Sequence, residues 1–214
     1  NKNIICVHKK IKNIQHTVQW IVRFTVTLLT LKEKFESQYI VRAWVDFMDA
    51  AARVRHKVFC QEKGWEEVQD NALEKDEYDT HSIPVVLIHK GSNEPIACVR
   101  LIRADWGDLQ VEQFIGPIKT EREESAEVSR LAVISDFRRR KNEQGKVFPE
   151  ATPDPIRWRF PIITVGVYLA LIHTARENNI EYLYFLTKES LVDSLKKLRA
   201  NPVQIGDSVE HKWI

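Results

Sequence analysis

The stretch IPVVLIHKGSNEPIACVRLIR, residues 83–103, holds two apolar runs separated by turn-forming residues. Ile83–His89 and Ile96–Arg103 are rich in β-branched side chains, and Gly-Ser-Asn-Glu-Pro lies between them. Runs of this type on either side of a short polar, glycine-containing segment are typical of a β-hairpin. We therefore predict two antiparallel strands joined by a short loop.

The residues before this hairpin predict a strand, a helix and a long loop. Gln38–Ala43 is a short β-type run, and apolar residues recur at helical spacing over residues 46–63. Asp46 is a suitable N-cap for that helix, and Gly64 is suited to end it. Residues 64–82 are polar and acidic, and loops of this length inside a domain are usually functional or disordered.

The residues after the hairpin predict further strands and two helices. Two short β-type runs lie around Leu109–Phe114 and Ala126–Ile134. A basic stretch with several prolines, residues 138–160, predicts an excursion loop. The remaining predicted elements are a helix over 161–178, a strand at Tyr182–Leu186, a helix at Lys188–Ala200, and β pieces at Val203–Ile205 and His211–Ile214.

The predicted order is strand, helix, β-meander, helix, strand, helix, strand. A meander flanked by helices and followed by a βαβ unit indicates a mixed sheet with helices on both faces. The N-acyltransferase (GNAT) superfamily has this order of elements. We therefore expect an α/β fold of the GNAT type, a three-layer α/β/α sandwich with a mixed, mostly antiparallel sheet.

The charge of the chain is uneven, although its net value is only +2. Residues 1–36 hold seven Lys/Arg and two Glu, which leaves a net charge of −3 for the rest. We predict a basic N-terminal arm over residues 1–37 and a GNAT-like acyltransferase domain over residues 38–214. Val18–Leu31 is too short to span a bilayer. It predicts an amphipathic helix packed on the domain, with a peripheral membrane contact as the alternative.

The composition argues against several kinds of site and partner. A hydrophobic content of 43% is enough for a sizeable core, and the small net charge gives no reason to expect nucleic acid. The three cysteines, Cys6, Cys60 and Cys98, and the seven histidines show no metal-ligand spacing. The odd, sparse cysteines also argue against a disulfide framework. We expect no metal, no bound cofactor and a cytoplasmic location.

Charged residues interrupt the apolar runs that we predict to be strands. Arg100 lies in the second strand of the hairpin, and Glu127 and Arg130 lie in the run AEVSRLAV, residues 126–133. Because side chains alternate along a strand, Glu127 and Ser129 should face one way and Arg130 the other. Buried charges are costly unless they are paired or lie in a cleft. Both an internal Arg100–Glu127 ion pair and a functional site fit this pattern.

A dense acidic segment, Glu74–Asp79, lies near the end of the predicted loop. It suits either a solvated loop or a partner for a cationic substrate or for arginines such as Arg55 and Arg100. Arg55 and Phe59 lie on one face of the predicted helix. Without a function, Phe59 and Trp65 would be core anchors and Arg55 a surface residue.

Nine of these residues form one ordered pattern. They are Arg55, Phe59, Trp65, Asp76, Asp79, Arg100, Phe114, Glu127 and Arg130. Their types, order and spacing resemble the signature of the acyl-homoserine lactone (autoinducer) synthases, and the resemblance covers roughly residues 38–214. Nine spaced matches are far more specific than a single short motif.

Other stretches are more similar to a sister group of that family. They are Tyr78–Ser82, Phe137–Arg140, the excursion at 141–160 and Val209–His211. The sister group comprises acyltransferases associated with PEP-CTERM/exosortase systems and the long-chain N-acyl amino acid synthases. The acceptor implied is S-adenosylmethionine for a lactone synthase and a free amino acid for the sister enzymes.

The resemblance implies an N-acyltransferase that moves a fatty acyl group from a thioester of acyl carrier protein or CoA to the amine of an amino-acid-derived acceptor. Glu127 would be the general base, through a water, because an ordinary carboxylate is a weak base. Arg100 and Arg130 would hold the carboxylates of the site. The residues implied to bind substrate are Arg55, Phe59, Trp65, Asp76, Asp79, Phe114 and Ser129.

The segment Arg138–Lys146 carries five positive charges and one negative charge. Such a loop suits either the pyrophosphate of CoA or an acidic acyl carrier protein, and its plain alternative is a solvated loop. We assign donor binding to Arg138, Arg139, Arg140 and Lys141. The competing functions are a GNAT acetyltransferase that uses acetyl-CoA and a catalytically silent GNAT-fold binding module.

Overall fold

The computed structural model describes residues 3–9, 35–138, 162–197 and 202–209. Within these ranges the chain forms a seven-stranded sheet with the strand order β2-β3-β4-β5-β6-β1-β7. The pair β5–β6 is parallel, and the other pairs are antiparallel. The strands are β1 (Asn3–Lys9), β2 (Tyr39–Ala43), β3 (Ser82–His89), β4 (Glu94–Arg103), β5 (Ser125–Val133), β6 (Tyr182–Lys188) and β7 (Pro202–Gln204).

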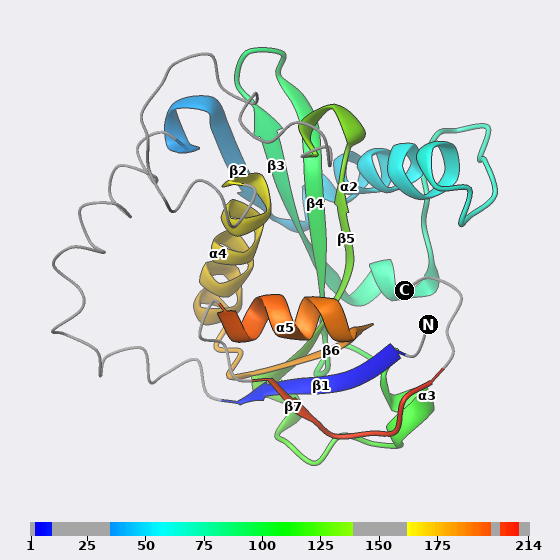
Figure 1. Cartoon of the computed structure of the whole chain (residues 1–214), viewed down its shortest axis with the longest axis vertical. Helices are drawn as coiled ribbons and strands as arrows, with labels where there is room; N and C mark the ends of the chain where they lie inside the picture. The colour runs from blue at the N-terminus through cyan, green and yellow to red at the C-terminus, as the bar shows by residue number, and fades with distance from the viewer. Residues whose placement is uncertain (1–2, 10–34, 139–161, 198–201, 210–214) are drawn as a thin grey trace, which may run out of the picture.

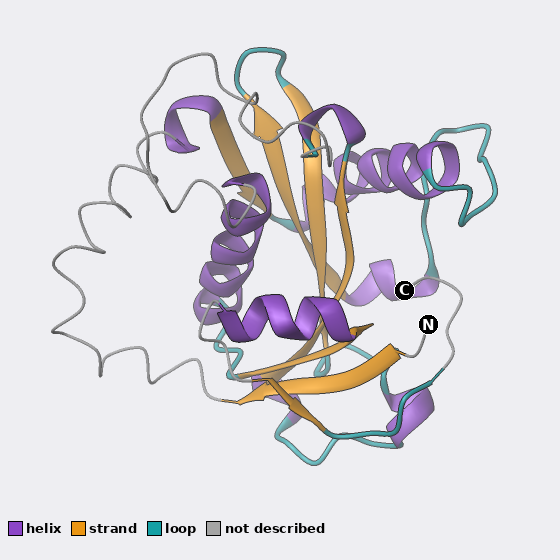
Figure 2. Ribbon diagram, in the orientation of Figure 1, coloured by secondary structure: helices purple, strands orange, loops and turns teal. Residues whose placement is uncertain are grey.

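Helices cover both faces of this sheet (Figures 1 and 2). The α-helices are α2 (Met48–Arg55), α3 (Glu112–Ile115), α4 (Ile162–Glu177) and α5 (Glu189–Lys197). The shorter helical pieces are η2 (Val45–Phe47), η3 (His56–Glu62), η4 (Glu77–His81), η5 (Arg122–Glu124) and η6 (Ser135–Phe137).

The central strands β3 and β4 show why two helical layers are needed. Consecutive residues of both strands are buried, so both faces of the sheet are covered there. Helix α2 packs on these strands from one side and α4 from the other, while α5 packs on β6 (Figure 1). The predicted three-layer sandwich with a mixed, mostly antiparallel sheet is confirmed.

Most elements lie where the sequence placed them, with two local corrections. Asp46 is not an N-cap: it lies inside η2, and neither η2 nor α2 has a side-chain cap hydrogen bond. Residues 109–114 are not a strand: a turn at 110–111 is followed by the first three residues of α3. The Glu112 carboxylate accepts hydrogen bonds from the backbone N–H groups of Leu109 and Ile118, which closes a local loop instead of a ladder.

The N-terminal residues add a strand that the sequence analysis did not predict. Strand β1 lies between β6 and β7 and pairs with both. The division of the chain near residue 37 stays a prediction, but β1 belongs to the same sheet as the strands of residues 38–214. The amphipathic helix predicted at Val18–Leu31 and the β piece at His211–Ile214 lie outside the described residues.

Strand β5 is irregular in its pairing with both neighbouring strands. Its pairing with β6 extends only from Ser125 to Glu127 over the described lengths of the two strands, which then diverge (Figure 1). On its other side, the register with β4 shifts between Cys98 and Arg100, and Arg130 has a φ of 54°. The second half of β5 therefore has an edge that is not paired to β6, and it contains a bulge.

Candidate active site

Arg55, at the C-terminal end of α2, is fully buried and holds the acidic loop onto the helix. Its Nη1 and Nη2 donate to the two carboxylate oxygens of Asp79, at 2.7 and 2.6 Å. Its Nε lies 2.5 Å from Oε2 of Glu74, and Nη2 also donates to the Glu74 carbonyl. The interpretation of Arg55 as a surface residue is therefore wrong.

Arg100 of β4 and Arg130 of β5 bind the same group of carboxylates. Arg100 Nη1 donates to Asp76 and also to Asp79 Oδ1, at 2.8 Å for the latter. Arg130 Nη2 donates to Asp76 Oδ2 at 2.9 Å, and Arg130 Nε donates to Glu74 Oε1 at 3.1 Å. These contacts link three cations and three anions without a break.

The six side chains form a closed cycle of alternating charge, which we call the arginine–carboxylate ring. In order, its members are Arg55, Asp79, Arg100, Asp76, Arg130 and Glu74. The ring is formally neutral, and each member contacts two members of opposite charge. Pairing of this kind is what makes buried charge tolerable. The solvated-loop interpretation is therefore wrong for Glu74, Asp76 and Asp79.

Local hydrogen bonds fix the acidic loop in the shape that the ring requires. Asp76 Oδ1 accepts from the backbone N–H of Tyr78 at 3.0 Å, and Asp79 Oδ2 accepts from that of Asp76 at 3.1 Å. These two bonds form a capping box at the start of η4. Burial acts to raise the pKa of Asp79, but Arg55 and Arg100 hold it well below the usual range of an aspartate.

The bulge in β5 explains why Arg130 joins the ring. Regular alternation would place Arg130 on the face opposite to Ser129, and that prediction is wrong. Ser129 Oγ accepts from Arg100 Nε at 3.0 Å, while Arg130 contacts Asp76, so both residues contact the same ring. The positive φ of Arg130 changes the alternation at this point.

Glu127 lies beside the ring but is not a member of it. It is 1% exposed, and its Oε2 accepts a hydrogen bond of 2.9 Å from the backbone N–H of Val111. Arg100 makes its ion pairs with Asp76 and Asp79, and no ion pair joins it to Glu127, so the interpretation as an internal Arg100–Glu127 pair is wrong.

Burial raises the pKa of Glu127 to about 7. Hydrogen bonds from Val111 and Gln110 and the charge of Arg100 act in the opposite direction, and Glu112 raises the pKa slightly further. A carboxyl group that titrates near neutral pH is a far better proton acceptor than an ordinary glutamate, and strongly shifted groups are typical of functional sites.

The aromatic residues of the signature lie on two sides of the ring. Phe59 and Trp65 stack with their ring centroids 5.8 Å apart, and the guanidinium of Arg130 lies 6.0 Å from the centroid of Phe59. Phe114 of α3 instead packs against the buried cluster around Val111 and Tyr184, on the side of Glu127. Trp65 is 36% exposed and is therefore not a core anchor.

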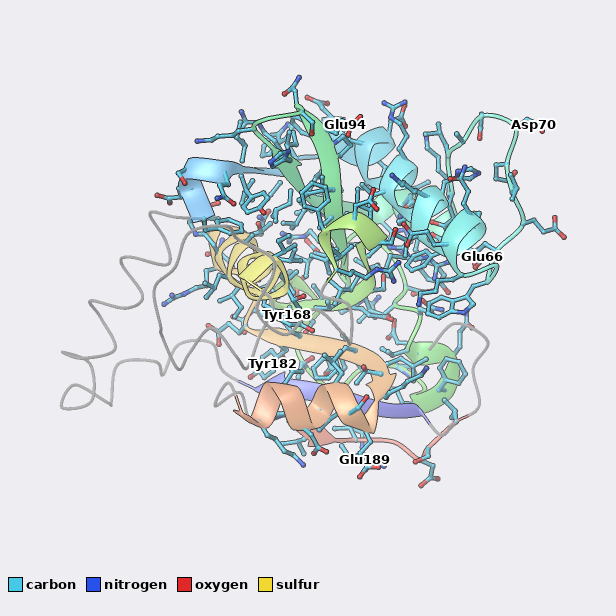
Figure 3. All side chains as sticks on the ribbon, turned by 45° about the horizontal axis from the view of Figure 1, so that its top comes forward. Glu66, Asp70, Glu94, Tyr168, Tyr182 and Glu189 are labelled. Atoms are coloured by element: carbon cyan, nitrogen blue, oxygen red, sulfur yellow. The ribbon has the colours of Figure 1, made fainter. Side chains whose placement is uncertain are left out.

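An open hollow of about 420 Å³ lies against the Arg130 side of the ring. Figure 3 shows the loop that borders it, with Asp70 at the outer tip and Glu66 closer to the sheet. Carboxylates predominate in its lining. The residues that line the hollow are Glu66, Glu67, Gln69, Asn71, Leu73, Glu74, Lys75, Asp76 and Arg130.

Comparisons with known proteins agree with this geometry. Residues 54–146 match the family model described as the acetyltransferase (GNAT) domain. Over this stretch the chain is similar to the GNAT acetyltransferases. Among solved structures, the AHL synthase LasI is similar with a TM-score of 0.52 and 18% identity, covering 74% of this chain and 77% of that one.

A second similar structure is that of TofI in a ternary complex with an inhibitor and MTA. Its TM-score is also 0.52, with 16% identity, and the match covers 75% of this chain and 78% of that one. At these identities the likeness supports the fold. No curated protein matches the chain.

The residues to which we assigned donor binding are only partly described. Arg138 follows η6 and pairs with Glu62 at the end of η3, and Glu62 also accepts from the backbone N–H of Ser135 at 2.9 Å. Arg139, Arg140 and Lys141 lie outside the described residues. Arg138 is thus held beside η3 and is not a member of the ring.

Two further findings concern metal binding and membrane spans. The described residues hold no group of histidine, cysteine or carboxylate side chains arranged to bind a metal ion. None of the helices in the same ranges has the length and apolar character that a membrane span requires.

Two parts of the site were not predicted from the sequence. Glu74 completes the ring, and its only signal was its place in the acidic segment. The second is the backbone N–H of Val111, which donates to Glu127 and which no sequence pattern marks.

Proposed function

We propose that this GNAT domain transfers a fatty acyl group from a thioester of acyl carrier protein or CoA to the amine of an amino-acid-derived acceptor. The observation that carries the proposal is Glu127, a buried carboxyl group with a pKa of about 7 that lies directly beside the arginine–carboxylate ring. Only a free amine is nucleophilic, so the reaction needs a base that is ionised at neutral pH.

The proposed reaction is an addition of the amine to the thioester followed by elimination of the thiol. Glu127 takes a proton from the acceptor's ammonium group through a water, and the nitrogen lone pair then attacks the thioester carbonyl carbon. The tetrahedral intermediate collapses with cleavage of the carbon–sulfur bond. The thiolate leaves and recovers a proton, and the amine nitrogen loses its second proton to give a neutral amide.

The edge of β5 beyond Glu127 supports this proposal. Its pairing with β6 ends at Glu127, so backbone N–H groups of the following residues are not used in a ladder with β6. Such groups can donate to the oxyanion that develops on the thioester oxygen, and oxyanion donors contribute strongly to acyl transfer. We assign the thioester carbonyl to this edge.

The charges near the hollow support an acceptor that carries both signs. Glu66 and Glu67 provide anionic groups beyond the ring, and Arg130 and Lys75 provide cationic ones. Asp76 and Asp79 are engaged with arginines, so their role is to organise the ring. Of the guanidinium nitrogens of Arg100, Nη2 has no hydrogen-bond partner among the described residues, which supports one hydrogen bond to an acceptor carboxylate.

The second candidate function is an acyl-homoserine lactone synthase that uses S-adenosylmethionine. It is favoured by one observation: six of the nine signature residues, Arg55, Asp76, Asp79, Arg100, Glu127 and Arg130, lie in or beside the ring. The two candidates share the base and the donor. They differ in the acceptor and in the ring closure that a lactone requires, in which the acceptor carboxylate displaces methylthioadenosine from the γ-carbon.

The test is a mass-spectrometric assay of the purified full chain. It is offered long-chain acyl carrier protein or acyl-CoA with S-adenosylmethionine, single amino acids or plain alkylamines, and Glu127→Gln is the control. We expect an N-acyl amino acid from the wild type and about 10²–10⁴-fold slower formation of it with the control. A lactone product would favour the second candidate, a preference for plain amines would contradict the acceptor, and no product with any pair would support a binding module.

A further inference from the structure

One side chain holds together the loop between β4 and η5. Glu112 Oε2 accepts from the backbone N–H of Leu109 at 2.8 Å, and Oε1 accepts from that of Ile118 at 3.0 Å. The Glu112 carboxylate therefore joins two points of the loop that are nine residues apart in sequence. Arg122 Nη1 completes the arrangement by donating to Oε1 at 2.9 Å.

Arg122 attaches this carboxylate to the end of β4. Its Nε donates to the Ala104 carbonyl at 2.7 Å, and its Nη2 donates to the Gly107 carbonyl at 2.8 Å. Burial acts to raise the pKa of Glu112, but Arg122 and the two backbone N–H groups hold it below its ordinary value. Glu112 is therefore ionised at neutral pH and binds all three donors as an anion.

The loop held in this way reaches both parts of the site. Val111, directly before Glu112, is fully buried and donates its N–H to Glu127 at 2.9 Å. Gln113, directly after Glu112, donates from Nε2 to the Tyr78 hydroxyl at 2.6 Å, and Tyr78 lies in η4, whose cap is Asp76. Residues 111–113 thus connect the base with the acidic loop.

We infer that Glu112 is a positioning residue: by closing the loop at Leu109 and Ile118, it keeps the Val111 N–H on the carboxylate of Glu127 and sets the pH at which that base becomes available. This inference rests on the role proposed for Glu127. The charged and titratable groups around Glu127 are Arg100 of β4, Tyr78 of η4, Tyr184 opposite it on β6 and Glu112 itself.

Two substitutions separate the reach of Glu112 from its charge. Glu112→Asp keeps the negative charge but shortens the side chain, so the loop loosens and the Val111 hydrogen bond weakens. Glu112→Gln keeps the length of the side chain and removes a charge that opposes ionisation of Glu127, but with one acceptor oxygen it keeps only one of the two backbone hydrogen bonds. Hydrogen bonds to a charged group favour ionisation and nearby like charges oppose it, so the two variants should move the titration of Glu127 differently.

The experiment follows Glu127 in the full chain by two independent measurements. The first is the pH dependence of single-turnover acyl transfer. The second is a ¹³C NMR titration of glutamate carboxyl groups, in which the Glu127 resonance is identified by its loss in Glu127→Gln. Glu123→Gln, an exposed charge removed from the same part of the chain, is the matched control.

We expect Glu112→Asp to raise the midpoint of the Glu127 titration, in both measurements, by roughly half to one pH unit. This is the size expected when a hydrogen bond to a charged group is weakened. Glu112→Gln should titrate below Glu112→Asp, and Glu123→Gln should match the wild type. The inference is overturned if Glu112→Asp leaves the midpoint of the Glu127 titration unchanged. It is overturned in that case even if Glu112→Gln lowers the midpoint, or if both variants only slow acyl transfer. If the wild type shows no acyl transfer, the proposed function fails while the NMR titration still decides the role of Glu112.

Discussion

The arginine–carboxylate ring predicts a large loss of stability for Asp79→Asn. Asp79 binds Arg55 through both oxygens, at 2.7 and 2.6 Å, and Arg100 at 2.8 Å. The substitution keeps the shape of the side chain but removes its charge and points an amide donor at an arginine. The ring then holds three cations and two anions, so one buried positive charge is no longer compensated.

The expected magnitude follows from the burial of these groups. Removing one partner of a buried ion pair costs about 3–5 kcal/mol, because a charge is left without its counter-ion. For a chain of this size, each kcal/mol lowers Tm by roughly 2–4 °C, so we expect a loss of about 6–20 °C. Circular dichroism during heating and urea unfolding followed by tryptophan fluorescence both measure it.

The dependence on pH gives a second measure of the same interaction. The pKa of Asp79 is depressed in the folded chain, so its ionisation stabilises the fold above the ordinary aspartate pKa of about 4. This stabilisation is lost as the pH falls below 4 toward the lower folded value. We expect the difference between wild type and Asp79→Asn to be largest at neutral pH and to shrink in acid.

Two variants check that the ring is the cause. Asp49→Asn removes an exposed carboxylate that pairs with Lys75 at 2.6 Å, and exposed pairs contribute little to stability. The double variant Arg55→Met, Asp79→Asn restores neutrality, so its cost should be less than the sum of the two single costs. A Tm of Asp79→Asn within about 2 °C of the wild type, or simple additivity in the double variant, would refute the argument from charge.

Three further predictions concern activity. Glu127→Gln should lower the rate of acyl transfer by about 10²–10⁴-fold in single-turnover assays. At pH 8 this variant should be at least as stable as the wild type, because the pKa of Glu127 is raised in the folded chain and its ionisation destabilises the fold as the pH rises. In the wild type the rate should rise with pH through about 7 and then level off, and a flat profile from pH 6 to 8 would contradict the base assignment. Replacing Arg138, Arg139 and Lys141 by Glu should raise the KM for the acyl donor. High salt should raise the same KM in the wild type, because salt screens exposed charges. If neither treatment changes the KM for the donor, this loop is not the donor site.

Local sequence patterns predicted the elements that carry the site. A regular apolar period predicted three of them, and the structure confirms each one. They are the hairpin of β3 and β4, the helix that contains Arg55 and the strand that contains Glu127. Arg100 and Glu127 stood out because a charged residue in a buried run needs a partner, whereas Arg55 stood out only as a member of the nine-residue signature. The acidic segment supplied plausible partners, although the sequence left open whether it faced solvent.

The parts that the sequence did not predict depend on local irregularity or on distant contacts. The position of Arg130 depends on a positive φ, which few residues other than glycine adopt and which alternation ignores. Leu109 and Val111 have strand-like spacing, but the Glu112 carboxylate closes them into a turn. Strand β1 is stabilised by pairing with residues about 180 positions away, which short-range patterns do not contain.

The closed ring separates the architecture of the site from its selectivity for an acceptor. Three elements far apart in sequence, α2, β4 and β5, each contribute one arginine, so the acidic loop takes its position only when all three are packed together. Since Asp76 and Asp79 are committed to arginines, they have little capacity to distinguish one acceptor from another. Glu66 and Glu67 line the hollow outside the ring, and Glu66 lies 3.9 Å from Nη2 of Arg130. Substitutions at these two positions should therefore change which acceptor is used, whereas substitutions in the ring should change whether the site forms.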